Sequence, residues 1–454
     1  MTRPQQMPRK RTLRLGAGAG FARDRIEPAV DLAERGDLDY LVLECLAERT
    51  IAHAQQARSA DPAKGFDPMF ASRMRALLPV QQRKGFSIVT NMGAANPHAA
   101  GRLALAIADE LGVTGLRVAV VEGDDVLEAV LASELDFIES GAPLRAVAAS
   151  VISANAYLGA EGIRDALRGG ANLVICGRVS DPALFLGPLV YEFGWSMTDW
   201  NKLGAGTLVG HMLECAGQVT GGYYADPGVK EVPALEDLGF PIGEVDASGA
   251  LCISKLSGTG GVVSVATCKE QLIYEIHDPR RYLQPDVIAD FSNVRIEQLG
   301  PDRVRLTGAT GRERPAMLKV SVAYSEGFVG EGQISYAGTG AADRARLAGE
   351  VVKARLQRAS ITQSELKFDL IGIDALHEAI GQRPAPPYEA RLRVAARTPC
   401  RESAEAIGRE VEALYTNGPA GGGGVTVATR EVIAVQSVLI PRQQVTTTVK
   451  ALCR

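Results

Sequence analysis

The chain has 454 residues, of which 46% are hydrophobic and 22% charged, and its formal net charge at pH 7 is -4. These values are ordinary for a globular protein and exclude a broad nucleic-acid-binding surface, which needs clustered Lys and Arg. No apolar run approaches the ~18 residues of a membrane span, and the basic N-terminus lacks the apolar stretch of a secretory signal. The seven cysteines are scattered along the chain, which favours reduced thiols in the cytoplasm.

The first half of the chain alternates short apolar runs with amphipathic stretches. Strands are predicted at residues 12–15, 38–44, 86–91, 116–122 and 172–177, with helices between them. Continuous apolar strands separated by helices are typical of a parallel sheet that is covered on both faces. We therefore predict a doubly wound, mostly parallel α/β domain over residues 12–230, after a disordered tail over residues 1–11.

The pattern changes near residue 230. An antiparallel meander is predicted from residues 302–310, 316–325 and 328–338. A helix at 341–358, strands near 366–373 and 389–396, a helix at 402–415 and a closing strand pair follow. This order predicts a second domain of the α+β class over residues 231–454.

The residues that directly follow the predicted strands supply the candidate substrate-binding set, because ligands of parallel sheets bind outside the carboxyl ends of the strands. Two later glycine-rich loops add to it, since glycine N–H groups can surround an anion or an oxyanion. The set comprises Gly16, Gly18, Gly20, Asn91, Asn96, Arg178, Asp181, Gly260, Asn417 and Gly422.

The segment GAGAG after the first predicted strand has two interpretations. It is similar to the dinucleotide-binding pattern GxGxxG, and Glu44 ends the next strand, where an acid that binds ribose would lie. An NAD(P)-dependent oxidoreductase is therefore one alternative. The spacing departs from that pattern, however, because Phe21 occupies its last glycine position. A tight turn without a cofactor is the other interpretation.

The polar members of the set also have structural alternatives. Arg178 directly follows a buried strand and suits bidentate binding of a carboxylate or phosphate. Asp181 is explained equally well as the cap of a helix. Asn91 and Asn96 bracket a loop, where an amide can hold a substrate carbonyl or simply stabilise a turn.

Four residues are candidates for catalysis: Glu44, His211, Glu214 and Lys255. Glu44 is predicted to do acid–base work or to favour the start of a helix by its charge. His211 and Glu214 lie three residues apart and share one helix face, which suits an acid–base histidine, a pair of metal ligands or a buried structural histidine. No further ligands with suitable spacing accompany them, so no metal site is predicted. Lys255 opens the glycine-rich loop KLSGTGG.

Several long segments carry a resemblance to a known family. TNMGAANP, CGRVSDPALFLGPLVYEFGW, GTLVGHMLECAGQVTGGYYADPG, KLSGTGG and YTNGPAGGGG resemble the acyclic terpene utilisation protein family, AtuA, over residues 12 to 445. The resemblance implies a bacterial protein that degrades acyclic terpenes or related branched acids through acyl-CoA thioesters. Many relatives carry an additional C-terminal domain of ferredoxin-like form. This chain ends at Arg454 without it, so a separate ferredoxin-like subunit would supply it if the site requires one.

Together these observations predict a cytoplasmic catabolic enzyme that acts on an acyl-CoA thioester or a carboxylic acid, as a hydratase, lyase or hydrolase. Glycine-loop N–H groups would polarise the carbonyl, Arg178 would bind an anionic group, and Glu44 or His211 would move the proton. No metal or redox cofactor is predicted, a CoA thioester is a candidate substrate, and a homo-oligomer is expected. A non-catalytic subunit that binds a small ferredoxin-like partner is a further alternative.

Overall fold

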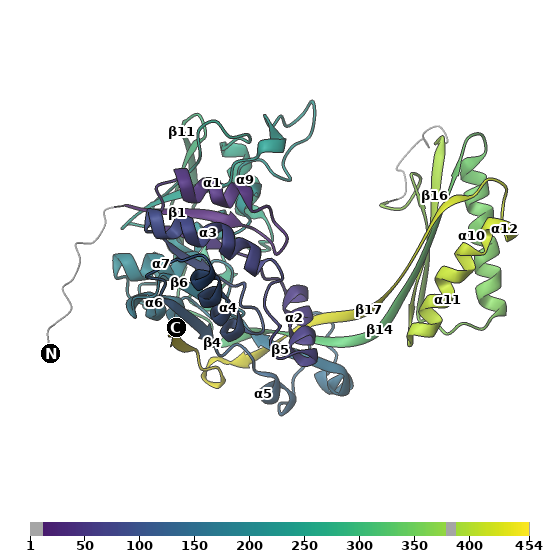
Figure 1. Ribbon diagram of the computed structural model, residues 1–454, viewed down its shortest axis with the longest axis horizontal. Coiled ribbons are helices and arrows are strands. Elements are labelled where there is room, and N and C mark those ends of the chain that lie inside the picture. The colour runs from purple at the N-terminus through teal and green to yellow at the C-terminus, as the bar shows by residue number, and fades with distance from the viewer. Residues whose placement is uncertain (1–11, 378–386, 454) are drawn as a thin grey trace. The chain divides into compact units, whose positions relative to one another are not determined.

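The computed structural model describes residues 12–377 and 387–453, which form two compact units (Figure 1). The first unit contains the described residues up to Ala323 together with those from Val435 onward, and the second contains Tyr324–Ala434. The tail predicted at residues 1–11 lies outside the described residues.

A ten-stranded mixed sheet forms the centre of the first unit, in the order β11-β12-β8-β7-β1-β2-β3-β6-β4-β18. The five strands from β1 to β4 in this order are parallel, and the flanking strands are antiparallel to their neighbours. The strands are β1 (Thr12–Ala19), β2 (Tyr40–Leu43), β3 (Ser87–Thr90), β4 (Val118–Glu122), β6 (Leu173–Cys176), β7 (Pro241–Asp246), β8 (Leu251–Lys255), β11 (Arg295–Gly300), β12 (Arg303–Thr307) and β18 (Thr448–Leu452). Every residue of β2 and β6 is buried, as expected for strands covered on both faces.

Helices pack on both faces of this sheet. Gly101 of α4 lies against Val118 and Val120 of β4, whereas Gly162 of α6 lies against Val121. Successive residues of a strand point to opposite faces, so α4 and α6 cover opposite faces of β4. The helices of this unit are α1 (Glu27–Arg35), α2 (Glu48–Ala60), α3 (Phe70–Lys84), α4 (Pro97–Glu110), α5 (Leu127–Leu131), α6 (Glu161–Arg168), α7 (Ala183–Phe193), α8 (Trp200–Leu213) and α9 (Val265–Ile273). The predicted mixed α/β class is therefore confirmed, and the doubly wound layout stays a prediction.

The predicted boundary at residue 230 falls inside the first unit. Strand β7 pairs with β1, where Gly243 is the partner of Leu15, and β8 and β12 extend the same sheet. The change of pattern near residue 230 marks the point where the sheet changes from parallel to antiparallel strands. The first unit also contains β5 (Val151–Ala156), β9 (Tyr282–Leu283), β10 (Ile288–Asp290) and β13 (Thr310–Arg312).

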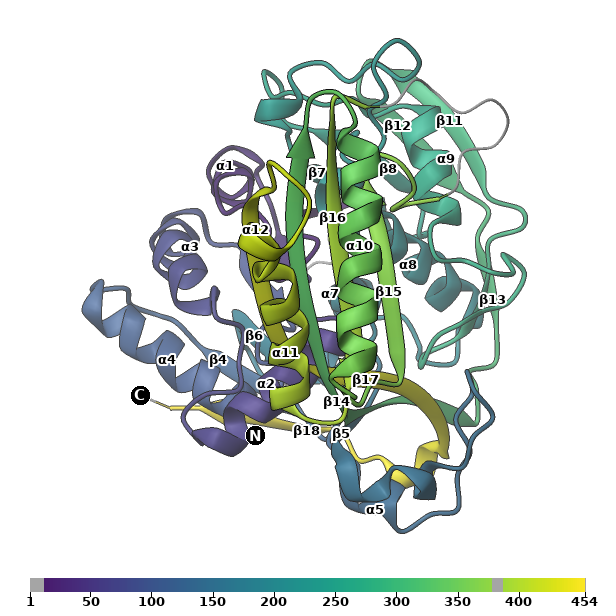
Figure 2. The same ribbon diagram turned by 90° about the vertical axis from the view of Figure 1, so that its right-hand side faces the viewer.

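The second unit has the element order of a ferredoxin-like fold. Its sheet order is β15-β16-β14-β17, and two helices that lie side by side, α10 and α11, pack on β16 (Figure 2). The elements are β14 (Met317–Ala337), α10 (Ala341–Arg358), β15 (Glu365–Ile371), β16 (Glu389–Thr398), α11 (Arg401–Glu412), α12 (Leu414–Asn417) and β17 (Gly423–Pro441). The first residues of β14 and the last residues of β17 belong to the first unit. The described chain therefore contains a ferredoxin-like unit of its own, whereas the resemblance predicted such a unit only as an additional domain or a separate subunit.

Two strand predictions in the second half are wrong. Residues 316–325 and 328–338 form the single strand β14, and the predicted closing pair is the single strand β17. Gly327 has a φ of 83° within the strand, and a strand absorbs such a residue as a local irregularity. Strand β12 pairs with β8 and β11 rather than joining a meander with β14. None of the described helices has the length and the apolar character to cross a membrane.

Candidate functional site

A pocket with a volume of about 270 Å³ lies in the first unit, beside residues that follow β2, β5 and β6. It combines carboxylates, an ammonium group and tyrosine hydroxyls with an apolar wall. Its lining residues are Glu48, Tyr157, Ser180, Asp181, Pro182, Glu275, Tyr282, Leu283, Gln284, Pro285, Pro315, Met317, Leu318 and Lys319.

Arg178 and Asp181 form the centre of this site. The side chain of Arg178 is 1% exposed, and its guanidinium donates to the carbonyl oxygens of Leu46 and Val179 and to the carboxylate of Asp181. The guanidinium also lies 4.6 Å from the centre of the Tyr157 ring. Because protein groups already surround it, the geometry favours a role of Arg178 in positioning Asp181 over the predicted grip on a substrate.

Asp181 brings a carboxyl group with a raised pKa to the pocket. Its side chain is 38% exposed, and packed protein atoms nearby desolvate its carboxyl group. Desolvation by these atoms raises the pKa of Asp181 to about 7, against the lowering effect of Arg178 and with a further rise from the charge of Glu214. A helix cap, which was the structural alternative for Asp181, does not account for this position, since no side-chain cap is found at the start of α7.

A second carboxylate carries a fixed charge on the pocket wall. The Tyr157 hydroxyl donates to Glu48 Oε1 over 2.6 Å, and Lys319 Nζ lies 3.4 Å from the same oxygen. Burial raises the pKa of Glu48, but the hydrogen bond from Tyr157 and the charges of Lys319 and Arg178 outweigh it and lower the pKa to about 2. The backbone N–H of Tyr157 donates to the Lys319 carbonyl oxygen over 3.0 Å, which keeps the two residues adjacent.

Glu44 and Asn91 lie together at the ends of β2 and β3. Glu44 Oε1 accepts hydrogen bonds from Asn91 Nδ2 over 2.9 Å and from the Leu46 N–H over 2.8 Å. Burial and the charge of Asp181 raise the pKa of Glu44 well above its usual value. Both side chains are buried and neither lines the pocket, so they stabilise the loop whose Leu46 carbonyl oxygen accepts from Arg178.

His211 and Glu214 form a buried pair at the end of α8. His211 Nδ1 is 3.0 Å from Glu214 Oε1, and Nε2 is 3.2 Å from the Leu272 carbonyl oxygen. The His211 ring packs on the ring of Tyr282, with 5.4 Å between their centres. Since Tyr282 lines the pocket, the pair lies directly behind its wall.

The glycines of the GAGAG segment serve packing rather than a turn. Gly16 and Gly18 belong to β1, which extends through Ala19, so the predicted turn after residue 15 is wrong. A Cβ atom on Gly18 would lie 2.7 Å from the Leu43 side chain, and one on Gly20 would lie 2.5 Å from the Cys215 carbonyl carbon. Close approach of neighbouring elements therefore explains the glycines. The dinucleotide-binding interpretation requires a turn at these glycines, and Gly16 and Gly18 are part of a strand instead.

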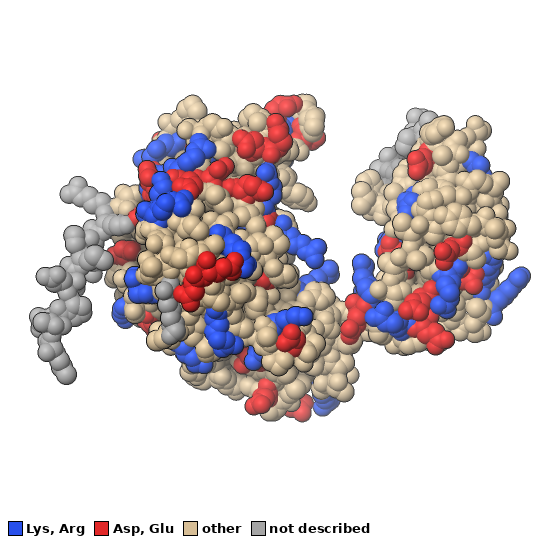
Figure 3. Space-filling view, in the orientation of Figure 1, with Lys and Arg blue, Asp and Glu red and all other residues tan. Residues whose placement is uncertain are grey.

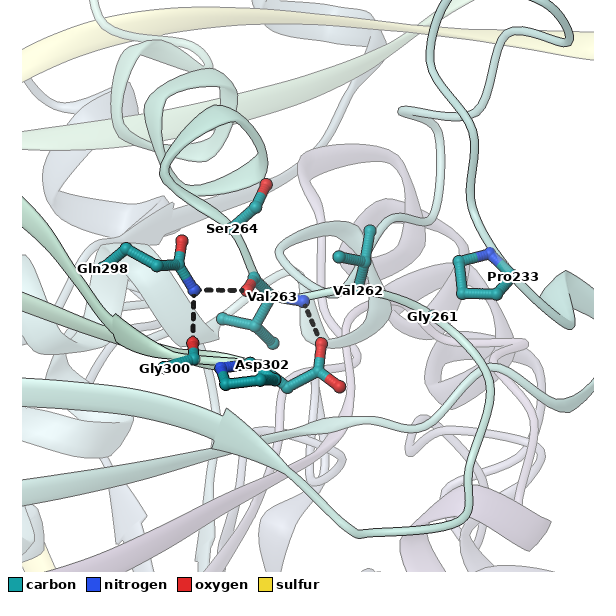
Figure 4. Close-up of a pocket in the computed structure, with 9 residues that line it drawn as sticks. Pro233, Gly261, Val262, Val263, Ser264, Gln298, Gly300 and Asp302 are labelled. Atoms are coloured by element: carbon teal, nitrogen blue, oxygen red, sulfur yellow. Dashed lines mark hydrogen bonds between the residues drawn. The ribbon is translucent and has the colours of Figure 1, made fainter.

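The KLSGTGG loop adjoins a second pocket, which has a volume of about 460 Å³ (Figure 4). Asp181 is not among the residues that line this second pocket. Lys255 Nζ donates to the Thr259 carbonyl oxygen over 2.8 Å and pairs with Asp302, whose Oδ1 accepts from the Val263 N–H. A Cβ atom on Gly260 would clash with the Ala234 carbonyl oxygen. These contacts brace the loop. Figure 4 shows Gln298 donating to two backbone carbonyl oxygens across the same pocket.

The remaining candidates have structural contacts. Asn96 Oδ1 accepts from the Ala99 N–H and caps α4. Asn417 and Gly422 lie in the second unit, where Asn417 donates to the Ala413 carbonyl oxygen and Gly422 lies against Tyr336. Nothing in these contacts distinguishes a ligand site.

Sequence reasoning missed Tyr157, Tyr282 and Lys319. Tyr157 follows β5, a strand that was not predicted, and Tyr282 belongs to the two-residue strand β9. Lys319 is a single charged residue within the predicted strand 316–325. Only the run SANAYLG, with a polar residue beside an apolar strand-like stretch, offered a signal.

On the face shown in Figure 3, Lys and Arg are interspersed with Asp and Glu over each unit. Within residues 12–377 and 387–453, no group of three or more His, Cys, Asp or Glu side chains is placed to hold a metal ion.

Comparison with known families decides the assignment. Residues 13–451 match the model described as acyclic terpene utilisation family protein AtuA. The chain belongs to this family. Membership in the AtuA family implies a role in acyclic terpene utilisation, and it confirms the resemblance found in the sequence.

Two further comparisons add little about this AtuA family member. No match was found among curated proteins. The solved structure of an aspartate kinase from Clostridium acetobutylicum covers 87% of this chain and 98% of its own, with 12% identity and a TM-score of 0.18. A likeness at this level supports no statement about fold or function.

Proposed function

We propose that this protein is an enzyme of acyclic terpene or branched-acid catabolism that acts on an acyl-CoA thioester or a carboxylic acid in the pocket of Asp181. The proposed reaction is of the hydratase, lyase or hydrolase type, in which a proton moves beside an acyl carbonyl group. The observation that carries the proposal is the carboxyl of Asp181, which lines the pocket, has a pKa of about 7 and is held by buried Arg178. Such a carboxyl can give and accept a proton at neutral pH, as general acid–base catalysis requires.

The rest of the pocket suits a substrate with a polar and an apolar part. Lys319 places an ammonium group where a carboxylate or a carbonyl oxygen of the substrate would bind. Leu283, Met317 and Leu318 provide an apolar wall for a hydrocarbon chain. The volume of about 270 Å³ is near the lower end of typical ligand pockets, which is roughly 300 Å³. We therefore propose that the acyl group enters the pocket while the nucleotide part of CoA stays outside.

The test is turnover of citronellol- and geraniol-derived acyl-CoA thioesters and free acids, followed by mass spectrometry. Asp181→Asn keeps the shape of the side chain but removes its titration, and we expect it to lower kcat by roughly 100-fold or more. Asp165→Asn removes an exposed carboxylate outside the pocket and serves as the control. Undiminished turnover by Asp181→Asn contradicts the proposal, as does failure of the unmodified protein to bind or convert any of these compounds. The cytoplasmic location and the homo-oligomer stay predictions.

A further inference from the structure

The hydrogen bonds of His211 determine how many protons the His211–Glu214 pair holds. Nε2 faces the Leu272 carbonyl oxygen, which can only accept, so Nε2 carries a proton. Nδ1 faces Glu214 Oε1 over 3.0 Å. Without a proton between them, the lone pair of Nδ1 and a carboxylate oxygen would repel each other. One further proton therefore lies between these two atoms, either on the imidazolium or on the carboxylic acid.

The pair is packed against the residues that hold the reacting carboxyl. A Cβ atom on Gly210, the residue before His211, would lie 2.5 Å from the Cα of Pro182, so α8 contacts the chain directly after Asp181. The His211 ring lies behind Tyr282, which lines the pocket together with Asp181. Both members of the pair are buried.

One carboxylate oxygen of Glu214 accepts no hydrogen bond from the described residues. Its Oε1 faces His211, whereas Oε2 is buried and has no hydrogen-bond partner within residues 12–377 and 387–453. A buried carboxylate oxygen without a donor is costly, because it has lost its hydration. After desolvation, the charge of Glu214 is also the largest influence that raises the pKa of Asp181.

We propose that His211 and Glu214 are positioning residues that adjust their shared proton to the charge of Asp181. When Asp181 gives its proton to the substrate, the shared proton moves from His211 Nδ1 to Glu214 Oε1. The Nδ1–H bond breaks and the Oε1–H bond forms, so the pair keeps the same number of protons. The charge of Glu214 falls from -1 to 0 at the moment when Asp181 becomes negative. Asp181 and Glu214 are thus never negatively charged at the same time.

This inference rests on the proposed role of Asp181 as the reacting group. Among the described residues, the other charged and titratable groups near Asp181 and Glu214 do not share a proton with a hydrogen-bonded partner as His211 and Glu214 do. Arg178 and Glu48 keep fixed charges, and burial raises the pKa values of the tyrosine hydroxyls and of the Glu44 carboxyl. Further titratable and charged groups interact with the two carboxyls or line the pocket with Asp181: Arg178, Glu44, Glu48, Tyr157, Cys215, Tyr282, Glu275 and Lys319.

The first test measures the protons of His211 directly in the full chain. Ring ¹⁵N chemical shifts, assigned by comparison with His211→Asn, should show a proton on Nε2 at pH 7. The Nδ1 shift should change as the pH passes through the titration of Asp181, and that change should be absent in Asp181→Asn. A neutral ring with its only proton on Nδ1 would overturn the proposal. An Nδ1 chemical shift that stays constant while Asp181 titrates would overturn it as well.

The second test follows Asp181 by the ¹³C shift of its carboxyl carbon in labelled protein, assigned with Asp181→Asn. Glu214→Gln removes the neighbouring negative charge, so we expect the titration midpoint of Asp181 to fall by about one pH unit. Glu275→Gln removes another carboxylate of the pocket, one that is not a hydrogen-bond partner of the His211 ring among the described residues, and should shift the midpoint less. An unchanged midpoint in folded Glu214→Gln contradicts the proposal. Both tests are independent of turnover, so their failure is distinguishable from failure of the proposed activity.

Discussion

Asp124 offers a quantitative test of how the strand ends are stabilised. Its Oδ2 accepts hydrogen bonds from the Arg178 N–H over 3.1 Å and from Asn155 Nδ2 over 2.8 Å. Burial outweighs these bonds and raises the pKa of Asp124 from 3.8 to about 6. A carboxyl whose pKa is raised by folding stabilises the folded chain below its unfolded pKa, and this contribution is lost as the pH rises through the folded value.

The magnitude follows from the two pKa values of Asp124. At pH 5 the folded chain keeps the proton and the unfolded chain has mostly lost it, which stabilises folding by about 1.4 kcal/mol. At pH 8 both states are ionised and the contribution is about zero. Asp124→Asn cannot titrate, so the stability difference between the original chain and this variant should shrink by about 1.4 kcal/mol from pH 5 to pH 8, in favour of the variant.

Urea unfolding followed by tryptophan fluorescence measures this difference, because Trp195 and Trp200 both lie in the first unit. The two proteins are compared at each pH, so contributions from other carboxyls cancel. Any constant effect of the substitution on packing also cancels between the two pH values. A difference that is equal at pH 5 and pH 8, or that favours the original chain more at pH 8, would refute the reasoning about buried Asp124.

Three further substitutions test other parts of the structure. Tyr157→Phe removes the hydrogen bond to Glu48 and should raise the pKa of Glu48 above its present value of about 2, which a ¹³C carboxyl titration would show; an unmoved value contradicts the assigned contact. Gly20→Ala should destabilise the first unit by about 1–3 kcal/mol in urea unfolding, because the added methyl group meets the Cys215 backbone. Leu392→Ala, in the buried core of the second unit, should destabilise that unit by about 2–5 kcal/mol. Hydrogen exchange should accelerate in β16 and not in β2, and equal acceleration in both would show that the two cores are not separate.

Long, regular segments were predictable because local pattern decides them. The helix predicted at 341–358 is α10, and the apolar run at 172–177 contains the fully buried strand β6. Errors concentrated where the pattern was ambiguous. The glycines at 16 and 18 predict a turn, whereas in the structure they pack against side chains of β2, and a single segment of sequence does not show such packing.

The candidate site was predictable in part. The rule that polar residues after parallel strands gather at one edge correctly brought Glu44, Asn91, Arg178 and Asp181 together. It could not tell that Arg178 is enclosed by carbonyl oxygens while Asp181 reaches the pocket. Burial depends on which loops cover a side chain, and the sequence does not specify this locally.

By itself, the sequence determined the family, the mixed α/β class and the strand ends that carry polar groups. These features follow from residue patterns over short distances, where hydrophobic periodicity and glycine placement act directly. The tertiary structure alone decided that strands within residues 241–307 extend the large sheet of the first unit and that Lys319 and Tyr282 join Asp181 in one pocket. It also decided the proton affinity of Asp181, because desolvation and neighbouring charges arise only when distant segments pack together.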